Sequence, residues 1–314
     1  MTTQLGSNTL DRARLLYSPA LRYFAAVAEH GAIRAASREL NVASSAVNRQ
    51  ILWLEESLGV PLFERVGRRL QLSPAGEILL RHVTSVLRDF EQTSSELDAL
   101  RGLKRGIVRI ASVESVATEL LADLAASFGK SYPDIQLRIT VTHSDNIARQ
   151  VLDSDADIGF SFDPPDEDLL AVNYSHDFEI GAVVIKDHPL AQKSTCSFED
   201  CLDYPIILPS RGLSLRSVID RLLAKIEMEP SVFAEVSTLQ MMRRLAARDL
   251  GICFQTRIGL HDSLDHAELC FLPLSDEQLQ CNKLSIVTHH QRKLKLAPAM
   301  FLSHAQQFFK QRYP

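Results

Sequence analysis

Four side chains that could read DNA bases lie on one face of a short segment. Ser45, Asn48 and Arg49 are spaced i, i+3 and i+4, and Ser44 lies one helical turn before Asn48. In a helix, residues at these spacings share a face. Short polar side chains and arginine supply the hydrogen bonds that distinguish base edges in the major groove. This face therefore predicts base contacts from the first turns of a helix.

Three arginines form a second group with a different chemistry. Arg65, Arg68 and Arg69 lie near the turn between two short extended runs, 62–65 and 69–72. Arginine binds phosphate through its planar guanidinium, and phosphate contacts fix register without reading sequence. The pattern predicts a hairpin wing beside a DNA backbone.

The charge is divided unevenly along the chain. The formal net charge is -5, but residues 1–105 carry 14 basic and 11 acidic side chains, a balance of +3. Residues 106–314 carry 20 and 28, a balance of -8. Lys104 is the first lysine, so arginine accounts for every Lys or Arg before it. The two parts are therefore expected to have different partners, with nucleic acid bound by the first.

Apolar spacing indicates the helices that position these groups. The run from Pro19 repeats apolar residues at i, i+3, i+4 and i+7 and stops at Gly31. A two-turn helix follows to Leu40, and after a short break a third helix spans 44–58. Helix, turn and a helix with a polar face indicate a helix-turn-helix. The third helix is expected to bury Val47, Ile51, Leu54 and Leu58.

A long helix is expected next, with Ser73 as its N-cap and Pro74 at its first position. Its heptad seam needs an apolar partner. The same helix of a second subunit would supply one, and burial within the same chain stays open as the alternative. The seam consists of Leu79, Val83, Val86, Phe90, Thr93, Leu97 and Leu100.

Beyond a predicted hinge at 102–106, strands and helices alternate, which is typical of an α/β unit with a mostly parallel sheet. Whether the strands form one sheet or two stays open. The predicted strands are 107–111, 135–142, 157–162, 180–185, 206–209, 233–236, 251–254, 270–273 and 283–288, and the predicted helices are 115–131, 145–152, 215–227, 239–247 and 298–312.

Several classes of protein are disfavoured by what the sequence lacks. It has no run of about 18 to 20 apolar residues, and its N-terminus has no signal-peptide core. A cytoplasmic protein with no membrane association is therefore expected. Dinucleotide, nucleotide, zinc-protease and serine-hydrolase motifs are missing, so no catalytic residue, cofactor or metal is predicted. The cysteines, which form no C-x-x-C pair, are Cys196, Cys201, Cys253, Cys270 and Cys281.

The stretch from Leu21 to Glu77 closely resembles the DNA-binding domain of LysR-type transcriptional regulators. It departs from the family at Ser44, where glutamine is frequent, and at Asn48, where serine is usual. The motifs that carry the resemblance are Ala35-Ala36 with Leu40, Ala46-Val47-x-Arg49-Gln50-Ile51-x-x-Leu54-Glu55, Leu58-Gly59-x-Pro61-Leu62-Phe63-Glu64-Arg65 and Ser73-Pro74-Ala75-Gly76-Glu77.

The resemblance implies an α/β protein with an N-terminal all-α winged helix-turn-helix, a linker helix, and a periplasmic-binding-protein-like effector domain of two α/β subdomains. The implied divisions are a tail at 1–18, a DNA-binding domain at 19–76, a linker at 77–103 and an effector domain at 104–314. Implied partners are a double-stranded DNA operator, a small-molecule effector, further subunits in a homodimer or homotetramer, and RNA polymerase. The carried-over DNA contacts are Ser44, Ser45, Asn48, Arg49, Arg65, Arg68 and Arg69.

The family also implies a set of effector contacts. The helix start at Ser115 would offer backbone N–H groups to an anion, which predicts a carboxylate effector. Glu114 places a negative charge beside it and suits a ligand with an amine. His143 could contact the effector, sense pH, or be an ordinary hydrogen-bonded residue. Each serine or threonine could instead cap a helix. The implied contacts are Ser115, Val116, Ser144, Phe160, Ser161, Ser210, Thr238, Phe254 and Gln255.

Together these features predict a sequence-specific transcriptional regulator whose effector domain binds a small metabolite, without catalysis. The alternative is a solute-binding or enzymatic α/β domain whose N-terminal helices serve only as an oligomerisation arm.

Overall fold

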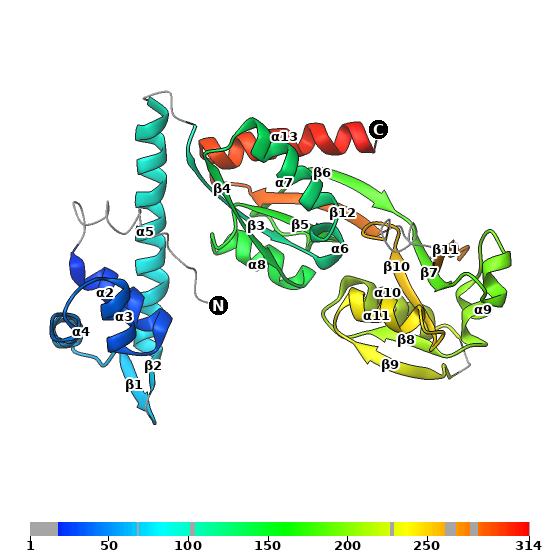
Figure 1. Cartoon of the computed structure of the whole chain (residues 1–314), viewed down its shortest axis with the longest axis horizontal. Helices are drawn as coiled ribbons and strands as arrows, with labels where there is room; N and C mark the ends of the chain where they lie inside the picture. The colour runs from blue at the N-terminus through cyan, green and yellow to red at the C-terminus, as the bar shows by residue number, and fades with distance from the viewer. Residues whose placement is uncertain are drawn as a thin grey trace. The chain divides into compact units, whose positions relative to one another are not determined.

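The helix-turn-helix forms where the apolar spacing predicts it. A computed structural model describes residues 18–67, 69–100, 104–226, 229–260, 268–276 and 282–313, and the chain divides into two compact units, Met1–Leu103 and Lys104–Pro314 (Figure 1). Gly31 ends the first helix with a φ of 62°, in the left-handed region that glycine adopts readily. The helices of this region are α2 (Pro19–His30), α3 (Ile33–Glu39) and α4 (Ser44–Leu58).

One prediction for α4 is wrong. Val47, Ile51 and Leu54 are buried, whereas Leu58 is 50% exposed. Leu58 is the last residue of α4, and Gly59 turns the chain there with a φ of 70°. The apolar period therefore continues into the final turn, but that turn lies at the end of the helix and not over the core.

The wing is a two-stranded hairpin in which β1 (Phe63–Val66) pairs antiparallel with β2 (Arg69–Leu72). The Glu55 carboxylate of α4 accepts hydrogen bonds from the backbone N–H groups of Leu62 at 2.8 Å and Phe63 at 3.2 Å. Bonds to an ionised acceptor are stronger than neutral ones. They hold the start of the wing against the C-terminal part of α4.

The linker helix α5 (Pro74–Leu100) begins as expected, because Ser73 Oγ accepts a hydrogen bond from the Gly76 N–H at 3.0 Å. Part of its seam is buried within its own chain: Val83 and Phe90 belong to the core of the first unit, together with Leu87, which lies outside the seam. Leu97, further along, is 56% exposed. Burial of the seam within the same chain therefore holds for the first half of α5. For the second half, association with a second subunit stays a prediction.

The second unit contains two mixed sheets among its described residues. The first has the strand order β4-β3-β5-β12-β6 and forms what we name subdomain I. β3 pairs parallel with β4 and β5, whereas β12 pairs antiparallel with β5 and β6. The strands are β3 (Gly106–Ser112), β4 (Ile135–Val141), β5 (Ile158–Phe162), β6 (Leu170–Phe178) and β12 (Asn282–His289).

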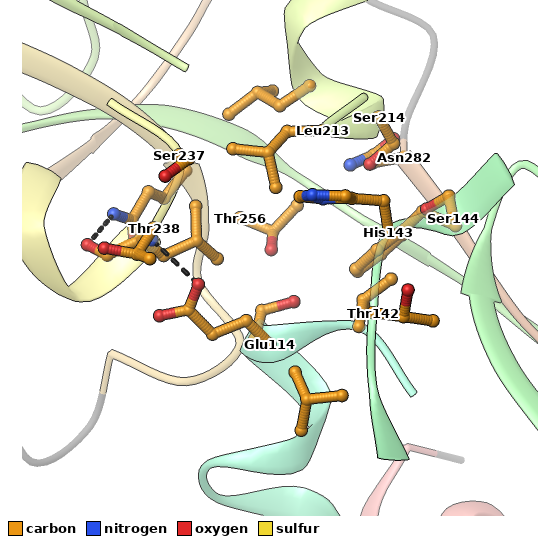
Figure 2. A pocket seen from close by; sticks show the side chains of 17 residues that line it. Glu114, Thr142, His143, Ser144, Leu213, Ser214, Ser237, Thr238, Thr256 and Asn282 are labelled. Atoms are coloured by element: carbon orange, nitrogen blue, oxygen red, sulfur yellow. Dashed lines mark hydrogen bonds between the residues drawn. The ribbon is translucent and has the colours of Figure 1, made fainter. Parts of the chain in front are cut away.

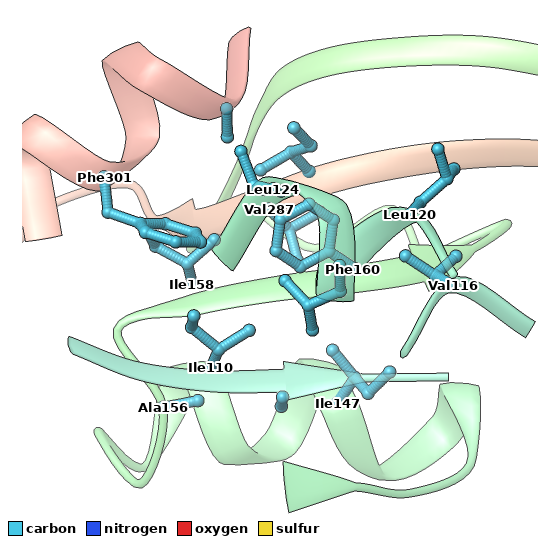
Figure 3. Packing of buried hydrophobic residues seen from close by; sticks show 14 of the residues in the cluster. Ile110, Val116, Leu120, Leu124, Ile147, Ala156, Ile158, Phe160, Val287 and Phe301 are labelled. Atoms are coloured by element: carbon cyan, nitrogen blue, oxygen red, sulfur yellow. The ribbon is translucent and has the colours of Figure 1, made fainter. Parts of the chain in front are cut away.

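Helices cover both faces of the first sheet. Phe160 of β5 packs with Phe301 and Leu124 in a single core, and Ile147 reaches the sheet from α8 (Figure 3). The packing requires glycine at position 159, because a Cβ there would overlap the Ile147 side chain. The helices are α6 (Glu114–Ala117), α7 (Leu120–Ser131), α8 (Ser144–Leu152) and α13 (Leu296–Arg312).

Subdomain II is built on the second sheet, with the order β11-β7-β10-β8-β9. Alternate residues of its strands face separate cores: Ile206 and Leu208 pack with α9 and α10, whereas Ile207 packs with α11. Its elements are β7 (Ile180–Ile185), η1 (Pro189–Gln192), α9 (Phe198–Leu202), β8 (Ile206–Pro209), α10 (Ser214–Leu223), β9 (Val232–Val236), α11 (Leu239–Ala246), β10 (Ile252–Thr256) and β11 (Leu269–Pro273).

Three further predictions need correction. The sheets are not mostly parallel, since β12, β7 and β11 all pair antiparallel. The helix expected at 115–131 is broken, because α6 ends at Ala117 and α7 begins at Leu120. The expected strands omitted β6, whose alternating polar residues mask its apolar face at the edge of the first sheet.

Candidate functional site

The exposed face of α4 carries the side chains predicted to read bases. Ser45, Asn48 and Arg49 are exposed, so each can reach a partner. Ser44 is half-buried, and its Oγ lies 2.8 Å from Ser37 Oγ of α3. The N-cap Ala43 has no side-chain hydrogen bond, so it leaves the first N–H groups of α4 without a side-chain acceptor.

The wing presents two of its three predicted arginines. Arg65 of β1 and Arg69 of β2 are exposed. In the hairpin register Arg65 is opposite Leu70 and Val66 is opposite Arg69, which places both arginines near the turn. Arg68 lies outside the described residues.

A cavity of about 350 Å³ lies between subdomains I and II. Residues at or just after the carboxyl ends of the parallel strands line it, as is common for ligand sites in α/β sheets. Subdomain I contributes Glu114, Ser115, Thr142, His143, Ser144 and Asn282, and subdomain II contributes Ser214, Ser237, Thr238, Gln255 and Thr256, together with apolar side chains from both.

Four of the predicted effector contacts line this cavity, namely Ser115, Ser144, Thr238 and Gln255. The others lie elsewhere. Val116, Phe160 and Phe254 are fully buried in hydrophobic cores, because their strands and helix turn them toward covering helices. The hydroxyl of Ser161 donates to the Phe162 carbonyl, and the Ser210 N–H donates to the Val236 carbonyl.

Sequence reasoning missed several lining residues. The sequence places Glu114 and His143 near the effector but does not include them among the implied contacts. It gives no indication of five further lining residues, Thr142, Ser214, Ser237, Thr256 and Asn282. Ser214 is the first residue of α10, and Thr142 directly follows β4. A search for polar residues at every strand end and helix start would have found both.

One end of the cavity has unfilled hydrogen-bonding capacity. The N-caps of α8 and α10, His143 and Leu213, make no side-chain capping bond. Ser144, the first residue of α8, is only 6% exposed, and its Oγ has no hydrogen-bond partner among the described residues. Figure 2 shows Ser144, His143, Asn282 and Ser214 on the same side of the cavity. Buried hydroxyls are normally paired, so the unpaired Ser144 hydroxyl distinguishes this part of the cavity wall.

Gln255 adds a second buried group without a partner. Its Nε2 donates to the Leu239 carbonyl at 3.1 Å, while its Oε1 has no partner among the residues that the structure describes. Because a carbonyl can only accept, this bond fixes the orientation of the amide. Oε1 is therefore a hydrogen-bond acceptor presented by a side chain that is 2% exposed.

Metal ligation has no support in the described ranges, where no cluster of three or more His, Cys, Asp or Glu could hold an ion. Cys196, Cys201 and Cys253 are buried free thiols, Cys270 is half-buried, and Cys281 lies outside those ranges. No described helix is long and apolar enough to cross a membrane.

Comparison with known families decides what these two units are. Residues 19–77 match the family of bacterial regulatory helix-turn-helix proteins of the lysR family. Residues 101–310, more than half of the chain, match the LysR substrate binding domain. The chain belongs to the LysR family. This LysR-type protein is thus a DNA-binding transcriptional regulator with an effector-binding domain, and its N-terminal helices are more than an oligomerisation arm.

Relatives of this LysR-type regulator match along most of their length. The uncharacterized transcriptional regulator YybE of Bacillus subtilis is 28% identical over 74% of this chain and 80% of its own. The transcriptional activator CmpR of Synechocystis is 25% identical over 90% of this chain and 92% of its own.

Solved structures of the family share the fold. CbnR complexed with its target DNA aligns with a TM-score of 0.70 at 21% identity and covers 92% of this chain and 98% of CbnR. The effector binding domain of QuiR in complex with shikimate aligns with a TM-score of 0.58 at 22% identity, over 67% of this chain and 100% of that domain. At these identities the alignments establish the fold.

Proposed function

We propose that this LysR-type regulator binds its operator through the exposed face of α4 and the two wing strands. Ser45, Asn48 and Arg49 read base edges, while Arg65 and Arg69 contact phosphates. Ser44 positions α4 through its contact with Ser37. Arg68 remains a predicted phosphate contact. The exposure of these side chains and the complex of CbnR with its target DNA support this assignment.

The cavity between subdomains I and II is the proposed effector site. The observation that carries this proposal is Ser144, a lining residue whose buried hydroxyl has no partner among the described residues. The uncapped N-termini of α8 and α10 would stabilise a negative charge beside it. A carboxylate is therefore the proposed group at this end, and the shikimate complex of QuiR is a precedent for a small acidic ligand in this fold.

Binding there would change the preferred arrangement of the two subdomains, and hence the spacing of two α4 helices in an oligomer. A ligand shifts such an equilibrium only by its difference in affinity for the two arrangements. The proposed protein is a cytoplasmic homodimer or homotetramer that contacts RNA polymerase at its promoters, holds no cofactor and catalyses no reaction.

The first experiment is recovery and sequencing of genomic DNA fragments bound by the purified protein at moderate salt. A few sites with dyad symmetry are expected, because a two-fold protein reads two half-sites. Uniform recovery of unrelated fragments would refute sequence-specific binding through α4. The genes beside the recovered sites would supply candidate effectors for binding measurements.

A further inference from the structure

One carboxylate crosses the cavity and bonds to the opposite subdomain. Glu114 is the first residue of α6 in subdomain I. Its Oε2 accepts a hydrogen bond from the Leu239 N–H at 2.9 Å, and its Oε1 accepts one from the Gln240 N–H at 3.1 Å. Both N–H groups belong to the start of α11 in subdomain II. Figure 2 shows Glu114 next to Thr238, away from the end formed by Ser144 and Ser214.

The first turn of α11 is fully supplied with acceptors. Thr238 Oγ1 accepts a hydrogen bond from the Met241 N–H at 3.3 Å. Glu114 accepts those from the Leu239 and Gln240 N–H groups. A helix start is where an anion is stabilised by free N–H groups and the helix dipole. Here the protein provides that anion from its own chain.

The other polar groups at this end include the hydroxyls of Ser237 and Thr238, which can donate as well as accept, and the amide of Gln255. Gln255 Oε1 is buried without a partner among the described residues, and Gln255 Nε2 donates to the Leu239 carbonyl of α11. Within the described ranges the cavity lining includes no lysine or arginine. A ligand carboxylate placed at this end would meet the fixed Glu114 carboxylate, and the two like charges would repel each other.

We propose that Glu114 is a specificity-determining residue that occupies the anion position of α11 and excludes carboxylates from that end of the cavity. The group accepted there is a hydrogen-bond donor, an amine or a hydroxyl, received by the Glu114 carboxylate. This inference rests on the proposed effector site. With a carboxylate at the Ser144 end, the effector class becomes a small hydroxy- or amino-carboxylate.

The same contact has a mechanical consequence. Glu114 joins α6 to α11 across 125 residues of sequence, so it holds the two subdomains in the arrangement seen here. Any arrangement that separates α6 from α11 exposes two N–H groups and a carboxylate to solvent. Glu114 therefore both selects the ligand and latches the cavity.

Hydrogen exchange of the full-length protein tests this role without knowledge of the effector. In E114A, the amides of residues 239–240 should exchange about tenfold faster than in the wild type, because a charge-assisted acceptor is lost. Acetate should then slow exchange in E114A by filling the vacated position. It should have no such effect in the wild type. Sodium chloride at equal ionic strength controls for screening.

Two further variants make the result decisive. E199A removes an exposed carboxylate from the first turn of α9 and should leave exchange at 239–240 unchanged. E114Q keeps an uncharged acceptor, so its exchange should fall between those of the wild type and E114A, and it covers the case in which E114A fails to fold.

Exchange at 239–240 that is the same in E114A and the wild type would overturn the latch. Acetate protection of equal size in the wild type would overturn the exclusion of carboxylates. Neither outcome depends on DNA binding or on an effector at Ser144, so failure of the proposed function is distinguishable: it would leave the exchange behaviour of Glu114 variants intact.

Discussion

The hydroxyl oxygens of Ser37 and Ser44 lie 2.8 Å apart and join α3 to the first residue of α4. Ser37 is buried and also donates to the Arg34 carbonyl at 3.1 Å. Ser44 was predicted as a groove-facing residue, but its hydroxyl is already engaged by its own domain. Its contribution to DNA binding is therefore expected to be the placement of α4.

A double-mutant cycle checks this placement. S37A and S44A should each weaken operator binding by a similar factor, and S37A/S44A should be no weaker than either single variant, because both remove one contact. Operator titrations of the three variants provide the measurement. Additive losses would instead indicate that Ser44 touches DNA independently of Ser37.

Replacement of Arg49 should be more damaging. R49A is expected to weaken operator binding by about 1 to 3 kcal/mol and to relax the preference at one base position, since an arginine that reads a base edge contributes this much. R292A removes an equal charge from an exposed position in the effector domain and should leave affinity unchanged. Equal affinity of R49A and R292A on a set of operator variants would exclude base reading by Arg49.

The wing arginines should act differently. R65A and R69A are each expected to weaken binding to all sequences alike and to reduce the slope of log affinity against log salt by about 1, because each removes a phosphate contact. Titrations at several salt concentrations measure the slope. A change in sequence preference with an unaltered slope would contradict the phosphate assignment.

The proposed effector site makes a separate prediction. S144L should fill the buried space beside the Ser144 hydroxyl and abolish the ligand-induced rise in melting temperature, while operator binding stays at the wild-type level. S194A, at an exposed position of subdomain II, serves as the control. Loss of ligand response and DNA binding together would point to misfolding, and an undiminished ligand response would remove Ser144 from the site.

His188 gives the fold a predictable response to pH. Burial lowers the pKa of His188 below its ordinary value of 6.5, although Asp249 acts in the opposite direction. Its Nδ1 accepts from the Leu190 N–H at 3.2 Å, and its ring packs on Tyr204 at 4.5 Å. The neutral ring is therefore the form that suits the fold.

The direction in which stability changes with pH follows from the lowered pKa of His188. Above pH 6.5 the stabilisation from His188 is present, and it is lost as the pH falls from 6.5 through the lower folded-state pKa, because the unfolded chain takes up the proton first. H188N keeps an N-cap acceptor but does not titrate. Melting temperatures from pH 7.5 to 5 should fall less in H188N than in the wild type, and parallel curves would refute the assignment.

Much of this fold could be predicted from the sequence because helix ends depend on residues close together in the chain. Gly31 and Gly59 mark the ends of α2 and α4, and Ser73 with Pro74 marks the start of α5. The cavity was harder to predict, since it forms where strand ends of two subdomains meet. Nothing within a few residues of Glu114 indicates that its carboxylate bonds to Leu239.

Local sequence patterns also fail to predict which residues of α5 are buried. Leu87 is buried although it is absent from the heptad positions, because the first half of α5 packs on a globular core and not on a single parallel helix. A period of seven residues describes a coiled-coil partner and gives no information on a broader contact surface.

The chain enters subdomain II from β6 and returns to subdomain I through β12, and these two strands are neighbours, with Phe178 paired opposite Asn282. Subdomain II is therefore an insertion between two adjacent strands of the first sheet. A tight turn joining Phe178 to Asn282 would close an ordinary β-hairpin and leave every strand of the first sheet uncut. Among the described residues between Phe178 and Asn282, Ile258 is the one that belongs to the hydrophobic core of the first sheet.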